Sequence, residues 1–385
     1  MGTKKGCQPS TFKCMRADMS IGILKELITS ERRVIANPET VKALCDLGYV
    51  VIVEGGAGEA INISDQEYML AGANISDAET IWNNCDYIIK YKAPIPEEYN
   101  RIQEDQHIFA IFHAEDNEDL IRILLEKKVT AVSLEFCHDG NSFCLAKAGG
   151  AMAGRIAAIY ALYHSLLPSG RAGKIICNDK SINPVTNALI IGSGNVAKAA
   201  AKTFIENGCE VTFLVSGERS LDKLKTEMFD FDFNAYINEP KRLTEMLKVA
   251  DIVIGAILIS TYDTPTMISE DMVISMKRGS ILIDATAGYG PGYIETFAHN
   301  TNLRDPYFYL HDVMHIKIDN LPAAAPISSV AYANEVYRPY LIECFQHIQS
   351  SGIMSETFRN GMITENGEVT HSVIKHHQEI LQWNF

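Results

Sequence analysis

The chain has 385 residues, of which 47% are hydrophobic, and its formal net charge is −14. This length exceeds what one hydrophobic core usually fills, so we expect two domains, and the negative charge opposes binding to nucleic acid phosphates. No apolar run approaches the roughly 18 residues of a membrane span, and nine scattered cysteines without a C-x-x-C pair favour a reducing compartment, so we expect a cytoplasmic protein.

The first half of the chain predicts one α/β unit. Residues 1–18 lack the apolar stretch of a secretory signal, and we expect a disordered extension there. Strands are then predicted at 20–26, 49–54, 87–92, 106–113 and 129–134, with helices at 38–47 and 120–126. Strands that alternate with helices indicate a parallel sheet covered by helices on both faces.

The second half repeats this alternation. An Ala-rich helix at 150–166 is expected to join the halves, followed by strands at 188–191, 210–215, 251–256 and 280–284 and helices at 197–207 and 221–228. A long helix at 328–346 is expected to return to the first unit. The predicted fold class is α/β, with two doubly wound Rossmann-like domains separated by a crevice. The expected domains are 19–145 plus 321–385 for substrate and 146–320 for a dinucleotide.

A glycine-rich turn marks the nucleotide site. It follows the buried strand 188–191, opens a helix, and consists of Gly192, Ser193, Gly194, Asn195, Val196 and Ala197. Gly192 permits the tight turn, Gly194 lets the backbone approach a pyrophosphate, and Ala197 keeps helix and strand close. The strand and helix on either side make this turn far more specific than the glycine pattern alone.

The end of the next strand bears on the choice of cofactor. No acid stands at the tip of strand 210–215, where an NAD enzyme usually holds the ribose hydroxyls. Ser216 and Arg219 could instead bind a 2′-phosphate, so we expect NADP to be preferred over NAD. Two alternatives stay open: Glu218 serves a ribose, or Arg219 is only a solvated loop charge.

Three basic residues stand at strand ends of the first unit. Arg33 follows the first strand, Lys92 ends the strand 87–92, and His113 ends the strand 106–113. Because the ends of parallel strands face one crevice, these side chains could bind a carboxylate, polarise a carbonyl and exchange a proton. The alternative is that each is structural. Cys137 and His138 lack further ligand spacing, so we expect packing there and no metal site.

At these positions the chain resembles the alanine dehydrogenase family, which includes N5-(carboxyethyl)ornithine synthase, lysine-forming saccharopine dehydrogenase and the transhydrogenase alpha subunit. The matching segments are 21–26, 31–34, 90–94, His113, 152–155, 192–197, 256–259 and 320–326. The resemblance implies that Arg33 and Lys92 hold a keto acid and that His113 acts as acid and base. It also implies that Ala256 and Leu258 lie against the cofactor.

The branch within this family points to the reaction. Segments 30–34 and 192–197 are similar to the carboxyethylornithine synthase branch, which uses NADPH. Gly288 stands where the family has an aspartate, and Pro326-Ile327 replaces a Pro-Arg pair. The leading expectation is therefore reduction of the imine between a 2-oxo acid and an amino acid amine, by a homo-oligomer. The alternatives are alanine-dehydrogenase-like deamination and a non-catalytic nucleotide-binding regulator.

Overall fold

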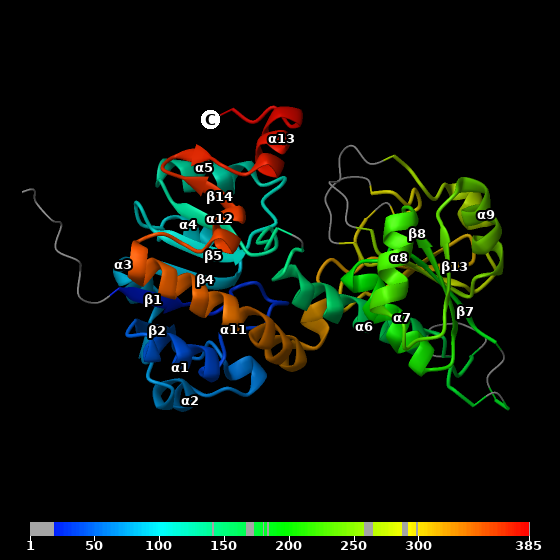
Figure 1. The fold of residues 1–385 in the computed structure, drawn as a ribbon, viewed down its shortest axis with the longest axis horizontal. Coiled ribbons are helices and arrows are strands. Elements are labelled where there is room, and N and C mark those ends of the chain that lie inside the picture. The colour runs from blue at the N-terminus through cyan, green and yellow to red at the C-terminus, as the bar shows by residue number, and fades with distance from the viewer. Residues whose placement is uncertain are drawn as a thin grey trace, which may run out of the picture.

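The computed structural model describes residues 19–140, 142–166, 173–179, 181–182, 185–257, 265–286, 292–297 and 299–384. Two sheets with their own helices form two lobes that lie side by side (Figure 1). Helices α6 (Ala146–His164) and α11 (Pro326–Ser351) run between the lobes and contact each other. Within the described part of the chain, no helix is long and apolar enough to cross a bilayer.

The first lobe is built on an eight-stranded sheet in the order β15-β14-β6-β5-β4-β1-β2-β3. Its strands are β1 (Ser20–Ile23), β2 (Val50–Glu54), β3 (Asn74–Ser76), β4 (Tyr87–Lys92), β5 (His107–Ile111), β6 (Thr130–Ser133), β14 (Met362–Glu365) and β15 (Glu368–Val369). The strands from β1 to β6 pair in parallel, and β14 and β15 are antiparallel. The strand order reverses between β1 and β4, which places a ligand-binding crevice at their carboxyl ends.

Alternating side chains of this sheet build a core on each face. Ile89 packs with α11 residues on one face, and Ile88 packs with Trp82 on the other. This follows from the period of two along a strand. The covering helices are α1 (Pro38–Asp46), α2 (Asp65–Leu70), α3 (Ala78–Asn84), α4 (Pro96–Tyr99), α5 (Glu118–Glu126), α12 (Glu356–Asn360) and α13 (Ser372–Ile380).

The second lobe is built on a seven-stranded sheet in the order β12-β13-β11-β10-β7-β8-β9. Its strands are β7 (Asn187–Ile191), β8 (Glu210–Val215), β9 (Asn234–Ile237), β10 (Ile252–Gly255), β11 (Ile281–Asp284), β12 (Phe308–Leu310) and β13 (Val313–Ile316). Its helices are α7 (Asn195–Glu206), α8 (Glu218–Glu227), α9 (Pro240–Val249) and α10 (Glu270–Ile274). Only β12 is antiparallel among these strands, and the order reverses between β7 and β10.

The prediction of two doubly wound Rossmann-like units is confirmed by these two sheets. The sequence did not predict the short strands β3, β9 and β12–β15. Of these, β3, β9, β12 and β15 have no buried residue, so they lack the buried apolar run that marks a strand such as β11. Domain boundaries at 145/146 and 320/321 stay a prediction, as does the disordered extension. Leu258 and Gly288 lie outside the described residues.

Candidate active site

The glycine turn lies at the point where the strand order of the second sheet reverses. Gly192 has φ +117°, and a Cβ there would collide with the carbonyl oxygen of Ala256 at the end of β10. A residue with a side chain would therefore strain the turn. Gly194 caps α7 without a side-chain hydrogen bond, and no atom lies within 4 Å of a Cβ built on it. The first N–H groups of a helix such as α7 have no partner within the helix and attract anions, which fits a pyrophosphate.

Close packing of α6 on α7 holds this turn in place. A Cβ on Gly154 of α6 would collide with the carbonyl oxygen of Val196, and its distance to the backbone nitrogen of Ala200 would be 2.9 Å. Ala197 and Ala200 are buried in the same lobe core. Glycine and alanine let the two helix backbones approach closely, so the helix that runs between the lobes is seated against the nucleotide turn.

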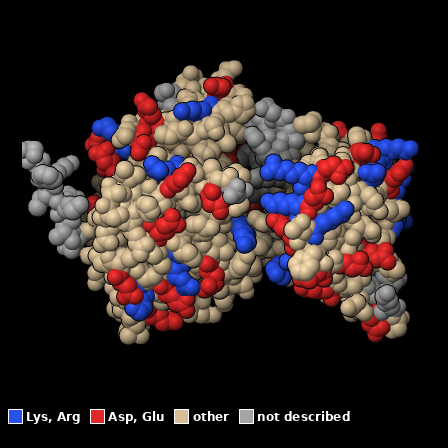
Figure 2. All heavy atoms as spheres, viewed as in Figure 1, with Lys and Arg blue, Asp and Glu red and all other residues tan. Residues whose placement is uncertain are grey.

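The end of β8 presents a polar, exposed group. Val215 is buried, whereas Ser216 and Arg219 are exposed, and the hydroxyl oxygens of Ser216 and Ser220 lie 3.0 Å apart. Gly217 caps α8 without a side-chain hydrogen bond. Figure 2 shows a hollow between the lobes, and Lys and Arg side chains gather over α8 on the side that faces it. These groups could receive an additional phosphate.

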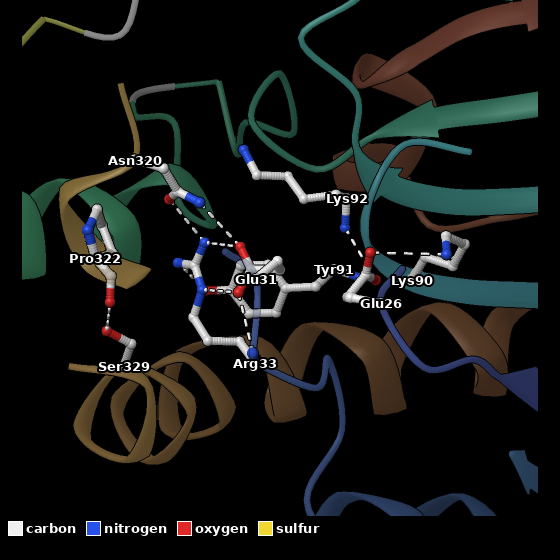
Figure 3. Close-up of polar contacts among 9 residues, drawn as sticks. All are labelled: Glu26, Glu31, Arg33, Lys90, Tyr91, Lys92, Asn320, Pro322 and Ser329. Atoms are coloured by element: carbon white, nitrogen blue, oxygen red, sulfur yellow. Dashed lines mark hydrogen bonds and ion pairs between the residues drawn. The ribbon is translucent and has the colours of Figure 1, made fainter. Parts of the chain in front are cut away.

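Arg33 is held in the first lobe by Glu31 (Figure 3). Its Nε donates to Glu31 Oε1 (2.7 Å), and its Nη2 donates to Glu31 Oε2 (2.5 Å) and Asn320 Oδ1 (2.8 Å). Its Nη1 donates to the hydroxyl of Tyr91 at 3.1 Å. Four of the five guanidinium N–H groups therefore donate to described residues, and one N–H on Nη1 has no hydrogen bond to any of them.

Asn320 joins the two lobes at this point. It follows β13 of the second sheet, and its Nδ2 donates to Glu31 Oε2 at 2.9 Å while its Oδ1 accepts from Arg33. Burial alone would raise the pKa of the Glu31 carboxyl, but the hydrogen bonds and charge of Arg33 outweigh burial and lower it. The Glu31–Arg33 pair is consequently charged at neutral pH.

Lys92 is directed into the crevice by a bulge in β4. The pairing of β4 with β5 shifts register between Ile89 and Lys92, and Glu26 Oε1 accepts the backbone N–H groups of Tyr91 (2.7 Å) and Lys92 (3.2 Å). Behind the bulge, buried Lys90 pairs with Glu98 at 2.8 Å. Figure 3 shows the Lys92 side chain extending away from Glu26 toward the side where Asn320 lies.

The surroundings of Lys92 lower the pKa of its ammonium group. Burial, and next the charge of Arg33, lower its pKa, while Asp319 acts in the opposite direction. No described residue forms a hydrogen bond or ion pair with its Nζ. A donor of this kind can polarise a carbonyl or exchange a proton.

His113 stands at the end of β5 in a left-handed conformation, with φ +43°. Glu135 Oε1 accepts the backbone N–H of His113 (2.7 Å), its Oε2 accepts that of Phe112 (3.2 Å), and His113 Nδ1 lies 3.8 Å from Glu135 Oε1. Burial lowers the pKa of His113, Glu135 and Asp319 oppose this, and Lys92 and Arg33 add to it. The imidazole is therefore a proton acceptor at neutral pH.

The three strand-end residues influence one another electrostatically, because the charges of Lys92 and Arg33 both lower the pKa of His113. The sequence did not single out Glu135 and Asp319. It indicated Glu31 and Asn320 only as members of the segments 31–34 and 320–326. The one local signal was the position of Glu31 two residues before Arg33.

The Cys137–His138 pair makes hydrogen bonds to residues nearby in the sequence. Cys137 Sγ donates to the carbonyl of Ser133 at 3.6 Å, and His138 Nδ1 accepts the N–H of Gly140 at 3.2 Å. The described residues contain no group of three or more His, Cys, Asp or Glu that could hold a metal ion.

Two doubly wound sheets, a glycine turn at one reversal point and a cationic acid–base group at the other define a dinucleotide-binding α/β protein. Comparisons with known proteins give its family. Residues 22–147 match the alanine dehydrogenase/PNT N-terminal domain, and residues 165–372 match the corresponding C-terminal domain. The chain belongs to the alanine dehydrogenase/PNT family.

Individual relatives agree. The chain is 32% identical over 360 residues to the alanine dehydrogenase of Staphylococcus haemolyticus, covering 92% of this chain and 94% of the relative. It is 30% identical to that of Bacillus subtilis over the same length and coverage. Among solved structures, an L-alanine dehydrogenase covers 94% of this chain and is itself covered completely, with TM-score 0.83 and 24% identity. A transhydrogenase from Sinorhizobium meliloti covers 91% and is also covered completely, with TM-score 0.75 and 22% identity.

These relatives confirm the predicted family, and the chain is a homologue of amino acid oxidoreductases. The names of these relatives favour the alanine-dehydrogenase-like alternative over the leading expectation of an opine-type condensation. They do not support a preference for NADP.

Proposed function

We propose that the protein catalyses the reversible, nicotinamide-dependent interconversion of an amino acid and a 2-oxo acid. The proposal is supported chiefly by the mutual electrostatic influence of Arg33, Lys92 and His113, and by the burial that lowers the pKa of Lys92 and of His113. Perturbed acid–base groups that meet in a crevice are a mark of catalysis rather than of nucleotide binding alone.

Arg33 and Lys92 would bind the 2-oxo acid. The remaining Nη1 N–H of Arg33 would meet the substrate carboxylate, and Lys92 Nζ would donate to the carbonyl oxygen. The Glu31 carboxylate fixes the plane of the guanidinium through two hydrogen bonds. The site is therefore oriented before the substrate arrives.

His113 would move the proton. The nicotinamide, when bound at the Gly192–Ala197 turn, supplies or accepts the hydride. In the direction of oxidation, water that adds to the imine carbon must lose a proton as the C–O bond forms. Neutral His113 can take that proton, while Glu135 beside Nδ1 stabilises the resulting imidazolium.

For the cofactor we propose a preference for NADPH over NADH. Support comes from the buried tip of β8 at Val215 and from the exposed Ser216 and Arg219 beyond it. We expect NADPH to bind at least about tenfold more tightly, which is about 1.4 kcal/mol. Arg219→Ala should remove most of the difference, and Lys223→Ala, an exposed lysine of the same helix, should leave it. Equal affinities of the wild-type protein would contradict the preference.

The amine co-substrate separates two candidates. The names of the relatives favour ammonia. Condensation with an amino acid is the second candidate, because Gly288 stands where the family has an aspartate. For either candidate we expect a cytoplasmic homo-oligomer.

The deciding experiment follows the oxidation of NADPH or NADH with pyruvate or 2-oxoglutarate, each against ammonia and a panel of amino acids. Turnover with ammonia supports the first candidate, and turnover only with an amino acid supports the second. Tight NADPH binding without turnover in any combination would identify a nucleotide-binding regulator instead.

A further inference from the structure

Asp319 lies next to the junction between the lobes. It immediately precedes Asn320, whose side chain is hydrogen-bonded to both Arg33 (2.8 Å) and Glu31 (2.9 Å). Consecutive Cα atoms are about 3.8 Å apart. The hydrogen bonds of Asn320 therefore place the backbone of Asp319 close to the Glu31–Arg33 pair.

The other carboxylates of the site already have partners. Glu31 holds Arg33, and Glu135 accepts the backbone N–H groups of Phe112 and His113. Asp319 is exposed and makes no hydrogen bond or ion pair with any described residue. Its charge nevertheless acts on both Lys92 and His113 from across the crevice.

The charges of these residues suit two different substrates. Arg33 and Lys92 form a cationic wall for the 2-oxo acid, and Asp319 is an unpartnered anion opposite that wall. Ammonia and primary amines are cations at neutral pH, and a carboxylate is their natural acceptor.

We propose that Asp319 is the residue that binds the ammonium group of the nitrogen-donating substrate and holds it opposite Lys92 and His113. This inference rests on the proposed function for its substrate class. It applies equally to ammonia and to the amine of an amino acid, since both present the same N–H donors.

The test compares Asp319→Asn with Asp312→Asn, an exposed aspartate at the opposite end of β13. With Asp319→Asn, the KM for the amine should rise about 10- to 100-fold, as expected for loss of one charged hydrogen bond. The KM for the 2-oxo acid and the affinity for NADPH should change by less than about threefold. Asp312→Asn should leave all three constants unchanged. An unchanged amine KM, or equal increases for both substrates, overturns the proposal.

A second measurement needs neither cofactor nor turnover. The NMR titration of the His113 ring, assigned with a His113→Gln spectrum, should move to lower pH in Asp319→Asn, because the Asp319 carboxylate raises the pKa of His113. The other charged groups that act on His113, which are Glu135, Lys92 and Arg33, are intact in both proteins. An unmoved titration overturns the placement of Asp319 whether or not the enzyme is active.

A failure of the proposed function can be distinguished from a failure of the proposed amine site. If the wild-type protein turns over no substrate pair, lysine is titrated into the protein loaded with NADPH and its binding is measured by calorimetry. Binding that Asp319→Asn abolishes supports the amine site, and absence of binding to the wild-type protein overturns it.

Discussion

Glu31→Gln tests whether the buried pair with Arg33 orients the substrate site. The side chains of Glu31 and Arg33 are 0% and 3% exposed, and the carboxylate accepts N–H groups from Arg33 and Asn320. Glutamine keeps the volume and one acceptor oxygen, but its NH₂ would point at the Nη2 and Nδ2 donors that Oε2 now accepts. Donors would face donors around an unpaired buried cation.

The expected cost is about 3–5 kcal/mol of unfolding free energy, the usual loss when one partner of a buried pair is removed. The assay is urea unfolding followed by tryptophan fluorescence. The only two tryptophans of the chain, Trp82 and Trp383, are both buried in one core of the first lobe, so the signal reports on the lobe that holds Glu31. Asp46→Asn removes the exposed pair with Lys42 from the same lobe and should cost less than about 0.5 kcal/mol.

The double variant Glu31→Gln/Arg33→Met refines the test. Removing both charges should cost less than the sum of the two single changes, because no buried charge is left unpaired. The pH dependence has a definite sign. Since the pKa of Glu31 is lowered from 4.5 in the folded state, the stabilisation is present above that value and is lost as the pH falls through the folded-state pKa. A cost below about 1 kcal/mol for Glu31→Gln would refute the reasoning.

Other expected outcomes concern catalysis. His113→Ala should lower kcat by roughly 10²–10⁴-fold while NADPH affinity stays nearly constant; wild-type turnover in the folded variant would end the proposed mechanism. Lys92→Met should lower kcat and raise the KM of the 2-oxo acid, since the donor to the carbonyl oxygen is lost; a loss of thermal stability with intact activity per folded molecule would instead show a structural role. The pH profile of kcat/KM for amino acid oxidation should keep its acidic limb below pH 6.5, because burial lowers the pKa of His113 from that value; a limb above pH 6.5 would contradict the assignment.

Local sequence patterns were sufficient to predict the two α/β units. The glycine turn at 192–197 could be predicted because a positive φ and an approach too close for a Cβ both demand glycine, and such demands act on single residues. Strands β4, β7, β8 and β11 and helix α1 were found within two residues of their bounds, since their apolar periodicity is a local property. Arg33, Lys92 and His113 were predicted as site residues because parallel strands end at one edge of a sheet, and their roles stay a prediction.

The partners of those residues were decided only by the tertiary structure. Arg33 and Asn320 are 287 positions apart, and neither position shows in the sequence that its side chain meets the other. Two further carboxylates come from positions that no sequence motif marked. Glu135 accepts the backbone N–H of His113, and the charge of Asp319 acts on Lys92. Periodicity reports which face of an element is buried, but hydrogen bonds and charge pairs between distant segments depend on how the sheets and helices pack. The sequence by itself therefore predicted Arg33, Lys92 and His113 as site residues, and packing of the two lobes decided which carboxylates lie beside them.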